Sequence, residues 1–249
     1  MHRFVKSLFL VTGLTIAGTF HAQHHANAWF RASVKVPVGA KFMLDNEFQH
    51  RRQNGIDNHN MFERDLLYSY RNWVKYQHKE DLAFSISPFA YFKHYRMVQN
   101  HADLSAAPLH EWRFSAAVDM QHELFPHFFI VDRISLEYRT FESNPGIMRL
   151  RNKFGLRYEI LPALHIAVHD EHILNLLGTP VDHFYDHERL TVDVEYQVIS
   201  GLKMNLGYMF LSRLPQNSKH RIHENNLFFN VSYVIPTHAS GKHISHKSS

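Results

Sequence analysis

Apolar and polar residues alternate with a period of two along most of the chain. Between Trp112 and Gln121, the even positions carry Trp, Phe, Ala, Val and Met, whereas the odd positions carry Arg, Ser, Ala, Asp and Gln. The same alternation runs through residues 148–160 and 189–198. Successive side chains of a strand point to opposite faces, so each segment has one apolar and one polar face. The pattern predicts β-strands, because a helix would scatter these charges around its circumference.

Eleven segments show strand character, and their connections alternate in length. Candidate strands lie near 28–36, 41–51, 61–76, 82–96, 109–124, 128–141, 147–160, 164–174, 184–199, 202–214 and 220–235. Short turns fall at 77–81, 125–127, 161–163 and 200–201, and longer polar loops at 52–60, 97–108, 142–146, 176–183 and 215–219. This alternation is typical of a transmembrane β-barrel, in which the short turns are periplasmic and the longer loops face outward.

The strand count is expected to be even, as in bacterial single-chain barrels. We therefore predict an all-β, antiparallel transmembrane barrel of about ten strands, formed by residues 41–235, with 28–36 as a non-spanning segment in the lumen or at the periplasmic rim. Twelve strands are possible only with a further crossing that the pattern does not supply. The ten strands, of 11 to 16 residues, are longer than those of most soluble sheets and suit a tilted crossing.

The orientation of the two faces separates two architectures. A soluble, periplasmic lipocalin-like barrel turns its apolar face inward, whereas an outer-membrane barrel turns it toward lipid and encloses the charges. Residues 227–235 (LFFNVSYVI) resemble the aromatic final strand that outer-membrane assembly machinery recognises. Aromatic residues that suit an interfacial girdle also favour the membrane barrel: Trp73, Tyr76, Tyr91, Phe92, Tyr138, Tyr158, Tyr208 and Tyr233.

The N-terminus has the character of a secretory signal peptide. Arg3 and Lys6 precede an apolar stretch at 8–18, and Ala22 is a suitable residue for cleavage. We therefore expect a signal peptide at 1–22, an N-terminal segment at 23–40, the barrel at 41–235 and a polar, His-rich tail at 236–249. The predicted location is the outer membrane of a Gram-negative cell.

Composition narrows the function classes. The absence of cysteine excludes disulfides, thiolate zinc sites and a cysteine nucleophile. After removal of Arg3 and Lys6, 25 basic residues face 23 acidic ones, which is not the charge balance of a nucleic-acid-binding protein. We expect no cofactor, a monomer, and three kinds of partner: outer-membrane lipid, the assembly machinery and a small anionic solute.

Several short motifs occur in an order that matches a known family. They are residues 132–139 (DRISLEYR), 149–158 (RLRNKFGLRY), 169–175 (HDEHILN), 187–189 (HER) and the pair Gly207-Tyr208. Together they resemble the uncharacterised outer-membrane proteins of domain of unknown function family 2490, over roughly residues 28–235. This chain has Ile173 and Leu174 where that family has an aromatic residue. The family has no established activity, so the resemblance implies only the fold and the location.

A ladder of charged residues follows the polar face of neighbouring strands. The predicted lumen network comprises Arg133, Glu137, Arg139, Arg149, Arg151, Arg157, Glu159, Glu171, Arg189, Asp193 and Glu195. Charges enclosed in a lumen need partners, because an unpaired buried charge is costly. One interpretation is a salt-bridged plug that rigidifies a small barrel. The other is a site in which guanidinium groups bind an anionic solute or a lipid head group.

Histidine is abundant, with 22 residues spread over most of the chain. His165, His169 and Glu171 share one face of a predicted strand and are weak candidates for metal ligands. Compositional bias is the alternative explanation, since no closed ligand set is evident.

No enzymatic activity is expected, although a lipid hydrolase is the alternative. Outer-membrane phospholipases carry a signature similar to H-x-S-N-G, and this signature is absent here. A serine and a histidine brought together from different strands would keep the alternative open.

Overall fold

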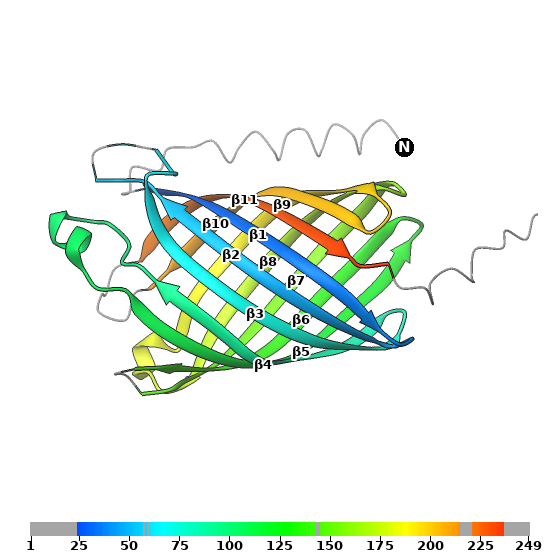
Figure 1. The fold of residues 1–249 in the computed structure, drawn as a ribbon, viewed down its shortest axis with the longest axis horizontal. Helices are drawn as coiled ribbons and strands as arrows, with labels where there is room; N and C mark the ends of the chain where they lie inside the picture. The colour runs from blue at the N-terminus through cyan, green and yellow to red at the C-terminus, as the bar shows by residue number, and fades with distance from the viewer. Residues whose placement is uncertain (1–23, 57, 59, 143–144, 215–220, 237–249) are drawn as a thin grey trace, which may run out of the picture.

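The computed structural model describes residues 24–56, 58, 60–142, 145–214 and 221–236, and within them eleven strands form a closed barrel (Figure 1). The expected signal peptide and nearly all of the polar tail lie outside these residues. The strands are β1 (His24–Val38), β2 (Phe42–Gln53), β3 (Arg64–Lys79), β4 (Leu82–His94), β5 (Leu109–Phe125), β6 (Phe128–Phe141), β7 (Ile147–Leu161), β8 (Leu164–Leu177), β9 (Tyr185–Ile199), β10 (Leu202–Arg213) and β11 (Ile222–Val234). Two short 3₁₀ turns, η2 (His101–Ser105) and η3 (Val181–His183), lie in the connections.

The barrel closes through a parallel pair of strands. Consecutive strands are antiparallel, so with eleven strands the first and the last run in the same direction, and β1 pairs with β11 in parallel. The expected count of about ten is close to eleven, but the assignment of 28–36 as a non-spanning segment was wrong. That segment lies in the wall within β1, between β2 and β11, so the barrel begins at His24 rather than at residue 41.

Buried side chains join the two strands of this parallel seam. Asn27 of β1 donates from Nδ2 to Glu224 Oε2 at 2.7 Å and to Asn226 Oδ1 at 3.0 Å, both on β11. All three residues are at most 1% exposed. Parallel pairing is slightly less stable per residue than antiparallel pairing, and these hydrogen bonds add side-chain connections across the seam.

Short turns gather at one end of the barrel and long connections at the other, as the sequence predicts (Figure 1). The short turns are 39–41, 80–81, 126–127, 162–163 and 200–201, and the long connections are 54–63, 95–108, 142–146, 178–184 and 214–221. Gly39 and Gly201 have φ angles of +70° and +84°, which a glycine adopts without strain in tight turns. Among the described residues, no helix has the length and apolar character needed to cross a membrane.

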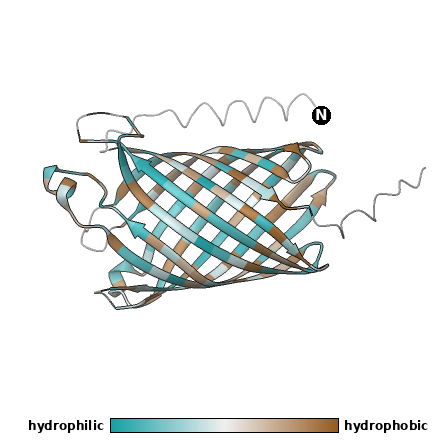
Figure 2. Cartoon of the chain, in the orientation of Figure 1, coloured by the Kyte–Doolittle hydropathy of each residue, from teal (hydrophilic) through white to brown (hydrophobic). Residues whose placement is uncertain are grey.

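The apolar face of the wall points outward and the polar face points into the lumen. On β6, Ile134 and Leu136 are exposed while Ser135 and Glu137 are buried. Hydrophobic and hydrophilic residues alternate along the strands around the barrel (Figure 2). This is the arrangement of a membrane barrel and the reverse of the lipocalin-like alternative.

Two of the expected girdle residues face the lumen instead. Tyr138, Tyr158, Tyr208 and Tyr233 are exposed on the outer wall, but Trp73 and Phe92 are buried and line the cavity. Phe92 turns inward because the register of β4 shifts between Ser87 and Ala90. An extra residue in a strand exchanges the two faces beyond it, so even positions face inward after this bulge.

Closure of the sheet leads to a prediction about gel mobility. Because every wall strand has two hydrogen-bonded neighbours, the barrel has no open edge and should stay folded in cold detergent. We expect an extracted sample to migrate faster without boiling than after boiling in gel electrophoresis. Equal mobility, with the protein recovered in the soluble fraction, would contradict a closed membrane barrel.

Candidate functional site in the barrel lumen

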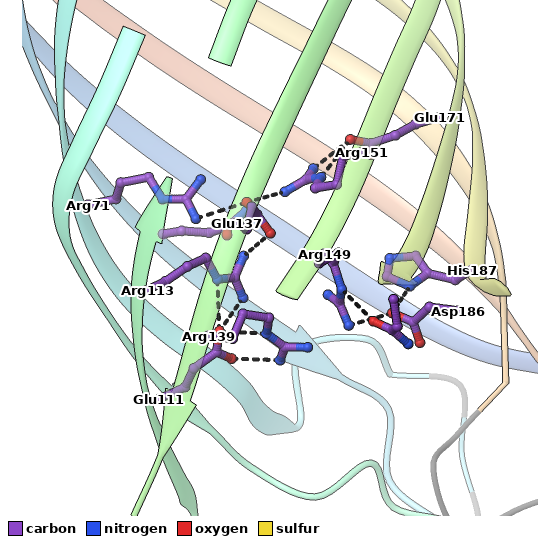
Figure 3. Close-up of polar contacts among 12 residues, drawn as sticks. Arg71, Glu111, Arg113, Glu137, Arg139, Arg149, Arg151, Glu171, Asp186 and His187 are labelled. Carbon is purple, nitrogen blue, oxygen red and sulfur yellow. Dashed lines mark hydrogen bonds and ion pairs between the residues drawn. The ribbon is translucent and has the colours of Figure 1, made fainter. Parts of the chain in front are cut away.

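A carboxylate on β6 is the centre of a buried ionic cluster. Glu137 is 1% exposed. Its Oε2 accepts a hydrogen bond from Arg113 Nη1 at 3.1 Å, and its Oε1 accepts from Arg151 at 3.0 Å and from Arg71 at 3.3 Å (Figure 3). These arginines come from β3, β5 and β7, so the interactions cross the lumen as well as following the wall. The negative charge of this one buried carboxylate is therefore shared among three guanidinium groups and offsets part of their positive charge.

A second carboxylate extends the cluster on β5. Glu111, which is fully buried, accepts two hydrogen bonds of 2.7 Å from the guanidinium of Arg139. Its Oε1 also lies 2.7 Å from Arg113 Nη2, and its Oε2 lies 2.8 Å from His94 Nε2. Arg113 thus bridges Glu111 and Glu137 (Figure 3).

A third carboxylate continues the cluster toward β9. Glu171 of β8 accepts from Arg151 at 2.6 Å and from Arg189 at 3.0 Å. Arg151 therefore bridges Glu137 and Glu171, and the chain of ion pairs extends from β5 to β9. Charge-assisted, forked pairs of this kind hold their members in fixed positions.

A neighbouring group of polar residues lies at the long-loop ends of β7, β8 and β9. Arg149 Nη2 is 2.5 Å from Asp186 Oδ2, and its Nε donates to Asn175 Oδ1 at 3.2 Å. The ring of His187 lies between Asp186, at 2.8 Å, and Arg189 Nη2, at 2.9 Å. Arg189 connects this group with Glu171 and hence with the central cluster.

The lumen contains a cavity of about 1440 Å³ with an excess of basic residues. Sixteen Lys and Arg residues line it, against nine Asp and Glu residues. Cations in excess of carboxylates in a confined space produce a positive potential, which attracts anions and repels cations.

The structure brings six of the predicted lumen residues into this connected system: Glu137, Arg139, Arg149, Arg151, Glu171 and Arg189. The other five face the lumen nearer the short turns, in separate interactions. Arg133 is paired with Asp119 at 2.6 Å, and Glu195 with Lys203 at 2.8 Å.

The remaining three predicted residues make looser or uncharged contacts. Arg157 Nη2 lies 3.6 Å from Glu159 Oε1, and Asp193 accepts a hydrogen bond of 2.6 Å from Asn205. The predicted ladder is therefore divided into one buried cluster and several partly exposed pairs.

Sequence reasoning missed Arg71, Glu111, Arg113 and Asp186 as members of the cluster. Glu111 and Arg113 follow the same alternation that identified Glu137 and Arg139, so the pattern on β5 contained the signal. Arg71 lies three strands from Glu137 in the wall order, and only the closed barrel brings the two together.

The weak metal candidates have separate partners. His165 Nδ1 lies 3.7 Å from Glu159, His169 Nε2 lies 3.5 Å from Asp193, and Glu171 is bound by two arginines. Within the part of the chain that the structure describes, no group of three or more His, Asp or Glu side chains comes together as a metal site.

The connection between β4 and β5 narrows the long-loop mouth of the lumen. Gln53 Nε2 donates to the carbonyl of Arg96 at 2.9 Å, and its Oε1 accepts from Val98 N at 3.1 Å. From this anchor, Met97 extends to Arg213 of β10, and the Nη2 atom of Arg213 lies 3.4 Å from the Sδ atom of Met97. Because β4 and β10 are five strands apart in the wall, this contact crosses the mouth.

The fold and the inward-facing charges define an outer-membrane-type β-barrel whose lumen is lined by charged side chains. A family model described as "Protein of unknown function (DUF2490)" matches residues 26–234, and the chain belongs to this family. The resemblance predicted from the short motifs is therefore confirmed. A search of curated proteins found no matching sequence.

Solved structures with a similar fold are outer-membrane proteins. The NanC porin is 10% identical, with a TM-score of 0.51 over 85% of this chain and 99% of the porin. A bacterial polysaccharide outer membrane secretin gives a TM-score of 0.44 at 10% identity, over 79% of this chain and 66% of the secretin. The outer membrane channel DcaP of Acinetobacter baumannii gives 0.35 at 10% identity, over 77% and 80% of the two chains. The likeness to the porin shows a shared fold.

Proposed function

We propose that this protein resides in the outer membrane as a monomeric barrel whose basic lumen binds small anions and passes them slowly. The excess of basic over acidic residues around the cavity carries the proposal. The exposed apolar wall suits contact with outer-membrane lipid, and the aromatic strand β11 suits recognition by the assembly machinery.

A narrow passage fits the geometry better than a wide pore. The cluster around Glu137 connects side chains of strands up to three positions apart in the wall, and the contact of Met97 with Arg213 crosses the mouth. Side chains fill the interior of barrels of about eight strands, and in this wider barrel the ion-pair cluster occupies part of the lumen. We therefore propose selective, low conductance, with the ion-pair cluster as its structural frame.

Catalysis is not part of this proposal. Ser85 donates to Asp119 at 3.4 Å, Ser212 accepts from Arg221 at 2.9 Å, and Ser87 and Ser105 donate to backbone carbonyls. The lipid-hydrolase alternative predicts fatty-acid release from vesicles, and such release by the folded barrel would favour it over the passage proposed here.

Planar-bilayer recordings under a KCl gradient test the proposal. We expect a small conductance whose reversal potential is displaced toward that of chloride. Lys153 lines the cavity and takes part in no ion pair among the described residues, so Lys153→Gln should lower the preference for anions. Lys93, on the outer side of β4, provides the matched control, and Lys93→Gln should leave the preference unchanged.

A preference for cations, or the absence of conductance in a sample that shows the folded gel mobility, would contradict the proposed passage. Equal effects of the Lys153→Gln and Lys93→Gln variants would show that the lumen charge does not set the selectivity.

A further inference from the structure

Two arginines at the β1–β2 side of the lumen lack the carboxylate partners that hold the central cluster together. Arg31 and Arg51 line the cavity, and neither takes part in an ion pair among the residues that the structure describes. Arg51 Nη2 donates to the amide oxygen of Gln49 at 3.0 Å, while its Nε is shielded from solvent and has no hydrogen-bond acceptor among those residues. A shielded guanidinium donor of this kind leaves binding capacity for an anion.

The guanidinium of Arg51 lies against the face of Trp29. Its Cζ is 3.5 Å from the centre of the indole ring, and the two residues are direct partners in the β1–β2 register. Arg189 approaches the same ring, with Cζ at 5.7 Å from its centre, and its Nε likewise has no acceptor within the described part of the chain. Two guanidinium groups around one indole repel each other, and an anion bound to Arg51 would relieve that repulsion.

Beside Arg51, the lining of the lumen has an apolar surface. Trp29 packs with Met209, Leu211 and Phe228 in one buried cluster on β1, β10 and β11, here called the seam cluster. All four residues line the same cavity as Arg51. The plug interpretation alone gives Met209, Leu211 and Phe228 no role.

We propose that Arg51 and the seam cluster form a binding site for a small organic anion with an apolar body. The carboxylate or phosphate group of the ligand is held by the Arg51 guanidinium, and its apolar part packs on Trp29, Met209 and Phe228. A forked guanidinium suits either oxyanion, and the flat indole suits a ring. This site rests on the proposed function in one respect, namely that anions enter the lumen.

The site can be tested by equilibrium dialysis of radiolabelled benzoate against the folded, full-length barrel in detergent, with empty micelles as the blank. We expect saturable binding with competition by unlabelled phenyl phosphate. Acetate and inorganic phosphate carry the charge without the ring, and benzyl alcohol carries the ring without the charge. Each of these three should compete at least about tenfold less well than benzoate, because each makes only part of the contacts.

Substitutions then assign the binding to this site. Arg51→Gln should weaken benzoate binding by about tenfold or more, and Arg51→Lys by a smaller factor, since lysine keeps the charge but not the planar fork. The matched control is Arg133→Gln. Arg133 is also a lumen arginine over an indole, with Cζ 4.8 Å from the centre of the Trp73 ring, but it is already paired with Asp119. This control should bind benzoate as the unmodified protein does.

Several results would overturn the site. They are the absence of saturable binding, equal binding by the Arg51→Gln and unmodified proteins, and equal losses in Arg51→Gln and Arg133→Gln. Acetate competing as well as benzoate would overturn the role of the seam cluster. The dialysis requires no ion current, so it tests the site separately from the passage. Benzoate binding to a barrel without anion-selective conductance would contradict the proposed passage and support the site. Anion-selective conductance without benzoate binding would contradict the site and support the passage.

Discussion

Replacing Glu137 with glutamine is expected to destabilise the folded barrel by about 3–5 kcal/mol, the usual consequence of removing one partner from a buried ionic group. The side chain is 1% exposed and accepts hydrogen bonds from Arg71, Arg113 and Arg151. The amide keeps the shape of the side chain but removes the charge that offsets three guanidinium groups. Urea unfolding of the barrel in lipid vesicles, followed by tryptophan fluorescence, measures the change.

A matched substitution distinguishes this effect from a general loss of lumen charge. Glu195 is paired with Lys203 at 2.8 Å, but the two side chains are 37% and 40% exposed. Since exposed pairs contribute little, Glu195→Gln should cost only about 0–1 kcal/mol. If Glu137→Gln and Glu195→Gln unfold at the same urea concentration, Glu137 does not have the central role assigned to it.

Introducing arginine in the middle of the outer wall is expected to cost about 2–4 kcal/mol in a bilayer. Leu136 is 42% exposed and lies on the outer face of β6, next to the inward-facing Glu137. If the outer wall contacts hydrocarbon, Leu136→Arg places a charge near the midplane. The free energy of unfolding in lipid vesicles, obtained from urea titration, provides the test.

The same substitution near the rim is the control for depth. Val198 is also on the outer wall, close to the turn at 200–201, where a long cationic side chain can reach the lipid–water interface. Val198→Arg should therefore cost only about 0–1 kcal/mol. Equal costs at Leu136 and Val198 would show that the wall does not sit in a bilayer as proposed.

The two lumen interpretations taken from the sequence apply to different parts of the structure. The ion pairs from Glu111 to Glu171 form a rigid frame in which most charges are satisfied. Arg31, Arg51 and Lys153 lie outside those pairs and give the cavity much of its excess positive charge. A structural network and an anion-binding surface can therefore coexist in one lumen.

Local pattern was sufficient for the strands, the turns and the faces of regular segments. Alternation over 128–141 predicted that Arg133, Glu137 and Arg139 share one face, and the structure places all three in the lumen. It failed at Phe92, because the bulge after Ser87 changes which positions face inward and a period-two count passes through it unchanged. It also failed at residues 28–36, where an expected even strand count outweighed the segment's own strand character.

Side-chain alternation and turn residues alone were enough to predict an all-β barrel with an apolar and a charged face, short turns at one end and long connections at the other. Three features could be seen only in the folded barrel: β1 closes it against β11, Arg71 meets Glu137 across the lumen, and Arg51 stacks on Trp29 with no carboxylate partner among the described residues. All three follow from closure of the sheet. Which charges meet depends on strand number, register and the curvature of the closed sheet, and these are set by hydrogen bonds between residues far apart in the chain.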